Sequence, residues 1–333
     1  MAIRTGRSYE VVALGSAIVD LFCQVPEGYV EELGFRKGSM QLVGPEVAGS
    51  VTDVLGEVEV RGGGSAANTL VGVASLGHQV AMIARTDQDE LGVRYVADLE
   101  KAGVRVVRPS ERNDLGTGRC LVMVTPDGER TMATWLGAAS HLKLDEKAKS
   151  VIADSEILYI EGYLYDLETT KAQIHAAIDV AVANEVSIAL SLSDPFCVVR
   201  HRDEFRDLVD RHVSILFANR EEARILTGED EVEKMADALR RKSLKGAVTL
   251  GASGAIAYDA SGRFHVPAAE VHPVMDTTGA GDLFAAGYLH GMLTLGGNDI
   301  EACGRYGVVC SSEVISHFGA RPNADLLTLI GEI

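Results

Sequence analysis

Short apolar, β-rich runs alternate along the chain with amphipathic stretches of helical periodicity. The predicted strands are Val11–Leu14, Val80–Ala84, Leu121–Thr125, Ile157–Ile160, Val186–Leu192, Ile215–Ala218, Ala247–Leu250 and Ala255–Tyr258. The predicted helices between them include Ala67–Leu76, Glu90–Ala102, Thr169–Asn184 and Glu231–Lys242. Because apolar strands that alternate with helices form sheets covered on both faces, this pattern predicts an α/β fold around a mainly parallel β-sheet.

Two regions interrupt the alternation. Residues from about Leu21 to Arg61 contain no long helical pattern, and Asn113–Leu136 reads as a hairpin around the turn Pro126-Asp127-Gly128. An Asp-Gly turn between β-rich arms is a strong hairpin signal. A β/α stretch separates the two regions, and we expect them to pair into a small sheet beside the main one.

Length and charge restrict the class of protein. The 333 residues suffice for one large α/β domain or two smaller ones, and 47% hydrophobic with 24% charged residues is ordinary for a soluble protein. Lys and Arg total 31 against 48 Asp and Glu, a formal net charge of −17. Such an acidic chain argues against nucleic-acid binding, which needs a high local density of cations.

The cysteines and the apolar runs indicate a compartment. The five cysteines are odd in number and include no Cys-x-x-Cys pair, and the nine histidines form no ligand-spaced pair, so we expect neither a disulfide framework nor a zinc site. No run approaches the roughly 18 to 20 apolar residues of a membrane span, and no signal-peptide core follows Met1. We therefore expect a cytoplasmic protein without membrane contact.

The run Asp276-Thr277-Thr278-Gly279-Ala280-Gly281-Asp282 is the most informative local motif. The apolar run that follows it predicts a buried helix, so the glycines lie where free N–H groups and the helix dipole favour a bound phosphate. A carboxylate at Asp282 beside such an anion is costly unless it handles a proton or a metal. The plainer alternative is a glycine-rich turn with Asp282 as an N-cap.

A second glycine-rich run, Arg61–Asn68, also precedes a predicted helix. Gly63 and Gly64 allow close approach of the backbone to a ligand, and Asn68 offers both a donor and an acceptor to a polyol. Asp20 lies at the carboxyl end of the first strand region, where a carboxylate can bind a vicinal diol. The alternatives are a flexible loop that Asn68 partly caps and an exposed turn aspartate.

Three further positions suggest contacts with phosphates or a metal. Asn219 and Glu222 follow a strand and share one face of the next helix, where they could orient Mg²⁺ through water or simply form a capping box. Arg130, in the predicted hairpin, could bind phosphate or be a solvated charge.

These motifs resemble the two signatures of the ribokinase-like (PfkB) carbohydrate and nucleoside kinases, over about residues 10 to 320. The resemblance implies that Asp282 deprotonates the substrate hydroxyl and that Gly279, Ala280 and Gly281 form an anion hole. It also implies that Gly63, Gly64 and Asn68 contact sugar hydroxyls and that Asp20 binds the 2′- and 3′-hydroxyls. The implied fold is one ribokinase-like domain over residues 1–333, with a lid formed by about 19–61 and 113–136.

The resemblance also implies the cofactors. ATP would contact Arg130, Asn219, Thr249, Gly251, Thr277 and the glycines of the second signature, and Mg²⁺ would lie near Asn219 and Glu222. The stretch Ser311–Arg321 corresponds to one that borders ATP and, in some relatives, a monovalent cation such as K⁺. The expected partners are a small-molecule nucleoside and ATP, and the protein would be a monomer or a homodimer.

Within the family, the chain is most similar to the adenosine kinase group. The segments Ser191–Phe196, Glu161–Leu164 and Arg130–Thr134 resemble those of that group, with Ser191, Asp194 and Met132 as departures. A purine slot would then be walled by Met132, Thr134, Tyr163 and Phe196. The implied reaction is ATP-dependent phosphorylation of the 5′-hydroxyl of adenosine; alternatives are a sugar kinase, another nucleoside kinase, and a nucleoside-binding regulator without activity.

Overall fold

The computed structural model describes residues 6–49, 58–109, 111, 114–242 and 244–332. Three expectations fall partly outside this range. The N-terminal residues 1–5, residues 50–57 of the first expected lid segment, and Asn113 at the expected start of the hairpin are not described. No helix in the described part of the chain is long and apolar enough to cross a membrane.

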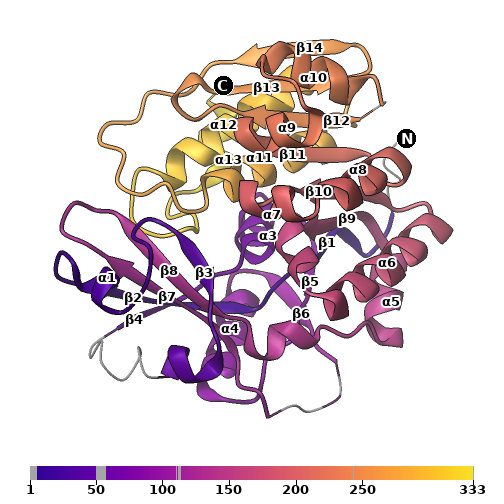
Figure 1. Ribbon diagram of the computed structural model, residues 1–333. Coiled ribbons are helices and arrows are strands. Elements are labelled where there is room, and N and C mark those ends of the chain that lie inside the picture. Colours follow the sequence, from indigo (N-terminus) through magenta and orange to yellow (C-terminus); the bar gives the residue numbers. More distant parts are fainter. Residues whose placement is uncertain (1–5, 50–57, 110, 112–113, 243, 333) are drawn as a thin grey trace.

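A large sheet forms the centre of the molecule (Figure 1). Its order is β14-β13-β12-β11-β10-β9-β1-β5-β6, and pairing is parallel except at β12–β13 and β13–β14. Its strands are β1 (Tyr9–Leu14), β5 (Val80–Ile83), β6 (Val104–Val107), β9 (Ser155–Glu161), β10 (Ser187–Ser191), β11 (Ile215–Asn219), β12 (Lys245–Thr249), β13 (Ala255–Asp259) and β14 (Gly262–Val266). This arrangement confirms the predicted α/β class.

Helices cover both faces of the large sheet. Successive side chains of a strand point to opposite faces of its sheet. In β1, Val11 and Ala13 belong to one buried core and Val12 and Leu14 to the other, so both faces are apolar and both are covered. The first core is covered by α3 (Ser65–Ser75), α4 (Glu90–Lys101), α11 (Ala280–Thr294), α12 (Ile300–Val314) and α13 (Leu326–Gly331). The second is covered by α5 (Glu146–Ala153), α6 (Glu168–Ala183), α7 (Pro195–Arg200), α8 (Arg202–Arg211), α9 (Arg220–Thr227) and α10 (Val232–Arg240).

A second, smaller sheet lies beside the first, at the lower left of Figure 1. Its order is β3-β8-β7-β2-β4, with β2 (Ile18–Gln24), β3 (Met40–Leu42), β4 (Glu59–Gly62), β7 (Gly118–Val124) and β8 (Arg130–Trp135). The antiparallel pair β7–β8 is the predicted hairpin, and β2 and β3 pair with it in parallel. The two interrupting regions therefore do form one small sheet, as predicted.

Candidate active site

A cavity of about 590 Å³ is lined by residues of both sheets. Strands β9, β10, β11 and β12 of the large sheet contribute residues from their carboxyl ends, where ligands of parallel sheets bind. Most of the predicted site residues line it: Asp20, Gly64, Asn68, Arg130, Met132, Thr134, Tyr163, Asn219, Glu222, Thr249, Thr277, Gly279, Ala280, Gly281 and Asp282. Residues far apart in the sequence thus meet in one cavity, and Ser65 and Asp282 are hydrogen-bonded across 217 positions.

Three predicted residues lie elsewhere. The structure does not bring Phe196 to the cavity: its side chain is 67% exposed, because Asp194 caps α7 in an orientation that buries Cys197 and Val198 instead. Gly63 lies behind Asp20, since a Cβ at this glycine would be 2.4 Å from an Asp20 carboxylate oxygen. Gly251 lines a neighbouring smaller hollow.

Asp282 lies on the first turn of α11 and is hydrogen-bonded to the start of α3. Ser65 donates its hydroxyl to Oδ1 at 2.6 Å, and Asn68 donates Nδ2 to Oδ2 at 3.0 Å. Burial raises the pKa of Asp282 to about 6, although these two hydrogen bonds oppose the shift. Oδ1 of Asn68 is buried without a hydrogen-bond partner among the described residues, so it can accept a bond from a bound hydroxyl.

The two glycine-rich turns require glycine at particular positions. Gly279 precedes α11 with φ of 78°, and a Cβ there would lie 2.7 Å from the carbonyl oxygen of Ala320. Gly64 precedes α3 with φ of 90°, and a Cβ there would lie 2.5 Å from the carbonyl oxygen of Ser16. Both turns therefore need a residue without a side chain. They bring two helix starts to the same cavity, where the positive end of each helix dipole favours an anion.

Asp20, on β2, is far from Asp282 in the sequence. In the structure both residues line the same cavity. Burial raises the pKa of Asp20 to about 7; Arg321 lowers it and the Asp282 charge raises it. An ionisable group with a pKa near neutrality in a cavity is a feature that binding and catalytic sites share.

Glu161, at the end of β9, is a cavity residue that the sequence analysis did not select. Its carboxylate accepts hydrogen bonds from the backbone N–H groups of Ser16 at 2.6 Å and Ala66 at 2.9 Å. Burial raises its pKa to about 7. Glu161 thus joins the loop after β1 to the start of α3, and the available signal was a charged residue directly after the apolar run Ile157–Ile160.

Asn219 and Glu222 form a capping box at the start of α9. Asn219 Oδ1 accepts from the Glu222 N–H at 2.9 Å, while the Glu222 carboxylate accepts from Asn219 N at 2.8 Å and Nδ2 at 2.7 Å. The capping alternative is therefore observed. Burial also raises the pKa of Glu222 to about 7, and this carboxylate has no ion pair with a described residue, so a cation at the cavity would find a suitable oxygen ligand.

Arg130 connects the small sheet to the signature turn. Its guanidinium donates to Asp276 Oδ1 and to the Thr278 hydroxyl. Asp276 also accepts from the N–H groups of Thr278 at 2.8 Å and Gly319 at 2.9 Å. Burial raises the pKa of Asp276, but the hydrogen bond from Arg130 and these two others together lower it below its usual value. Arg130 thus places a cation beside the signature turn.

A second hollow, of about 130 Å³, adjoins the cavity behind the signature turn. Thr249, Ala280, Gly281 and Phe284 line both spaces, so the two are adjacent. Its other lining residues include Gly251, Val308, Ser311, Ser312 and Ile315. The site therefore has two compartments that meet at the start of α11, a geometry that suits transfer of a group between two bound molecules.

Known proteins are similar to this chain in sequence and in structure. Residues 37–326 match the family profile described as pfkB family carbohydrate kinase. The ATP-dependent ribose-1-phosphate kinase of Halopiger xanaduensis is 31% identical over 279 residues, which cover 81% of this chain and 88% of that protein.

Two solved structures superpose on almost the whole chain. A probable sugar kinase from Rhizobium etli has a TM-score of 0.91 at 34% identity, covering 98% of this chain and 99% of its own. The adenosine kinase from Sinorhizobium meliloti has a TM-score of 0.90 at 36% identity, with the same coverage. The profile match and these similarities show that the chain belongs to the PfkB family of carbohydrate kinases, with a ribokinase-like fold.

Proposed function

We propose that the protein uses ATP to phosphorylate the 5′-hydroxyl of adenosine, giving AMP and ADP. One observation carries the kinase part of this proposal: Asp282, with a pKa raised to about 6, lies on the first turn of α11 directly after the Gly279-Ala280-Gly281 turn. A base and an anion site are thus adjacent, as in-line phosphoryl transfer requires.

In the proposed reaction, Asp282 accepts the proton of the attacking hydroxyl. Ser65 and Asn68 orient its carboxylate through their hydrogen bonds, and the unpartnered Asn68 Oδ1 accepts a bond from the sugar. Asp20 accepts the bonds of a vicinal diol. The N–H groups at the start of α11 stabilise the negative charge of the transferring phosphoryl group.

ATP would occupy the smaller hollow beside Thr249 and Gly251 and extend its phosphates toward Gly281, where the cavity and the hollow meet. Mg²⁺, when bound, would be oriented through water by Asn219 and Glu222 and would neutralise phosphate charge. Arg130 offers a further cation to the phosphates. The fit rests on the buried Glu222 carboxylate and on the glycines that leave space for the phosphates.

The purine part of the proposal rests on the apolar wall of the cavity. The side chains that form it come mainly from the small sheet and the residue after it: Ile18, Phe22, Cys120, Val122, Met132 and Leu136. Phe217 comes from β11 of the large sheet, and Tyr163 comes from the short 3-10 helix that follows β9. Apolar and aromatic surface rewards a flat purine. The 36% identity to an adenosine kinase supports the same substrate.

A sugar kinase or another nucleoside kinase is the second candidate. The exposed position of Phe196 removes one expected wall of the purine slot, and Glu161 and Ser16 add polar groups to the cavity. The 34% identity to a probable sugar kinase agrees with this alternative. In either case we propose that the small sheet acts as a lid over one ribokinase-like domain and excludes water from the reaction.

The test is a substrate panel with Mg-ATP, containing adenosine, guanosine, inosine, ribose, ribose 1-phosphate and fructose. We expect adenosine to exceed ribose by roughly two decades in kcat/KM, because burial of a purine face contributes on the order of 2 to 3 kcal/mol at about 25 cal/mol per Å². Faster turnover of a sugar would refute the adenosine assignment. Binding of nucleosides without any turnover would favour a regulator.

A further inference from the structure

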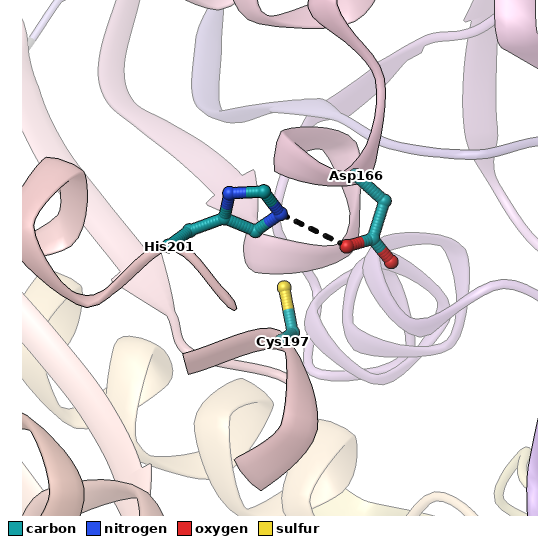
Figure 2. A group of neighbouring side chains, drawn as sticks. All are labelled: Asp166, Cys197 and His201. Carbon is teal, nitrogen blue, oxygen red and sulfur yellow. Dashed lines mark hydrogen bonds and ion pairs between the residues drawn. The ribbon is translucent and has the colours of Figure 1, made fainter. Parts of the chain in front are cut away.

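A separate cluster of three side chains lies beside the cavity, at Asp166, Cys197 and His201 (Figure 2). Asp166 ends the 3-10 helix η2 (Gly162–Asp166), Cys197 lies within α7, and His201 directly follows α7. Because Cys197 and His201 are four positions apart, the helix places both on one face. Their candidate ligand atoms and an Asp166 oxygen all lie within 4.8 Å of one another.

The three groups have the chemistry of a transition-metal site. Nε2 of His201 lies 3.1 Å from Asp166 Oδ1, and the Cys197 thiol points toward the Gly162 carbonyl oxygen at 3.3 Å. Cys197 is fully buried, and the side chains of Asp166 and His201 are 7% and 13% exposed. None of these three groups has a role in the proposed kinase chemistry. A thiol, an imidazole and a carboxylate together suit zinc, whereas Mg²⁺ prefers oxygen ligands alone.

We propose that Asp166, Cys197 and His201 bind one Zn²⁺ ion, with water as the fourth ligand. Zinc bonds of about 2.0 to 2.3 Å in a tetrahedron separate the ligand atoms by roughly 3.3 to 3.8 Å, so the ligand atoms need to approach one another by at most about 1 Å. On binding, the thiol proton passes to solvent as the thiolate donates to the metal. The Nε2–H of His201, which faces Asp166 in the free cluster, gives way to the tautomer with its proton on Nδ1, toward Glu204, so that Nε2 and one Asp166 oxygen donate lone pairs to the metal with no further net loss of protons.

Arg200 is the built-in competitor for this site. Its Nε and Nη2 donate to Asp166 Oδ1 at 3.0 and 2.8 Å, and Nη2 also contacts Oδ2 at 2.8 Å. The Arg200 side chain is 47% exposed, so it can turn into solvent and leave one oxygen to the metal. Glu204 lies 3.8 Å from the other ring nitrogen of His201 and can orient the imidazole from outside. Zinc and Arg200 therefore compete for Asp166.

The cluster also connects to the substrate cavity. Asp166 lines that cavity in addition to facing His201. A metal ion would thus bind Asp166, a residue that lines the substrate cavity, without binding Asp282. The sequence contains neither a Cys-x-x-Cys pair nor ligand-spaced histidines, and the spacing Cys-x-x-x-His does not by itself indicate a metal site because the third ligand comes from a different element.

The experiment is a Co²⁺ titration of the full chain without nucleotide and without Mg²⁺. We expect one equivalent of cobalt to produce thiolate-to-metal charge-transfer absorption, which Zn²⁺ abolishes by displacement. Cys197→Ser should remove the absorption, and His201→Asn should weaken cobalt affinity at least about tenfold. Arg200→Gln should tighten it, because it removes the competitor for Asp166. Cys303→Ser changes a buried cysteine on α12 and is the matched control, with wild-type absorption expected.

Two results would overturn the proposal. One is the absence of charge-transfer absorption at a tenfold excess of cobalt over folded protein. The other is absorption that persists in Cys197→Ser with an unchanged melting temperature. If Cys197→Ser does not fold, the cobalt affinities of His201→Asn and Arg200→Gln test the proposal instead. A purely structural ion network predicts that neither variant changes cobalt affinity, and that result would overturn the proposal. The readout is independent of substrate and of kinase activity.

Discussion

The floor and the lid-side wall of the cavity are built in different ways. The floor around Asp282 consists of hydrogen-bonded polar groups on two helices, α3 and α11, which pack together in the core. The wall consists of apolar side chains such as Val122 and Met132 on the small sheet. Arg130 is a direct hydrogen-bonded link from that sheet to the signature turn.

The difference indicates a division of tasks. Catalytic groups need positions that are fixed to within a fraction of an ångström, and buried helix starts provide them. Substrate selection needs contact area and the capacity to close, which a separate sheet provides. We therefore expect changes in the floor to reduce turnover and changes in the wall to alter substrate preference.

The largest effect is expected for Asp282→Asn. The amide cannot accept the hydroxyl proton, so kcat should fall by roughly 10²- to 10⁴-fold while substrate binding changes little. Steady-state kinetics and calorimetric binding of the nucleoside measure both quantities. Asp299→Asn is the matched control, because Asp299 also lies at a helix start but is remote from the cavity lining, and it should keep normal turnover. Near-normal kcat in Asp282→Asn would remove the assignment of the base.

Met132→Ala should be the clearest change in the wall. It removes apolar contact with a purine, so kcat/KM for adenosine should fall by about tenfold while any activity on ribose stays unchanged. Phe196→Ala is its control, since the exposed Phe196 should matter less than twofold for either substrate. A large loss in Phe196→Ala would instead show that α7 moves over the cavity when the substrate binds.

The pH dependence separates the two carboxylates of the site. Asp282 acts as a base only when ionised, and its pKa is raised to about 6, so kcat should fall about tenfold per pH unit below pH 6. Asp20, with a pKa raised to about 7, should affect kcat/KM at a higher pH. Both shifts favour the neutral form, so activity is gained as the pH rises. A flat kcat profile down to pH 4 would contradict the assignment of Asp282.

The smallest effect is expected for Glu222→Gln. The amide oxygen can still accept one hydrogen bond from Asn219, so the melting temperature should change little, whereas the Mg²⁺ concentration for half-maximal activity should rise several-fold. Asp89→Asn alters an N-cap on α4 without touching the cavity and is the control. A lower melting temperature with unchanged magnesium dependence would leave Glu222 with a capping role only.

Much of the fold could be predicted because its signals are local. The apolar runs of β1, β5 and β9 through β13 were all found, since a strand buried on both faces is apolar at nearly every position. The exposed strand β14 and the short helix α7 were missed. The burial of their residues depends on contacts with distant parts of the chain, which the local sequence does not reveal. Phe196 is an example, because the N-cap at Asp194 determines which side of α7 is buried.

The same distinction between local and long-range signals applies to the residues of the candidate site. Asp282 and Asn68 could be selected because glycines beside an apolar helix mark a turn that approaches a ligand. The hydrogen bond between Asn68 and Asp282 could not be predicted, since it joins residues 214 positions apart. Ser65 and Glu161 were missed for a related reason: their importance comes only from the partners that the fold brings to them.

The parallel pairing of β2 with β7 has a consequence for folding. Ile18 lies opposite Gly118, so the small sheet closes a loop of about 100 residues, which is costly in chain entropy before its contacts form. On the ribosome, β2 is synthesised early, whereas β7, which pairs with it, is synthesised about 100 residues later. Until β7 is made, one edge of β2 is unpaired and can pair with other chains. We expect the protein to be most prone to aggregation at this stage of synthesis.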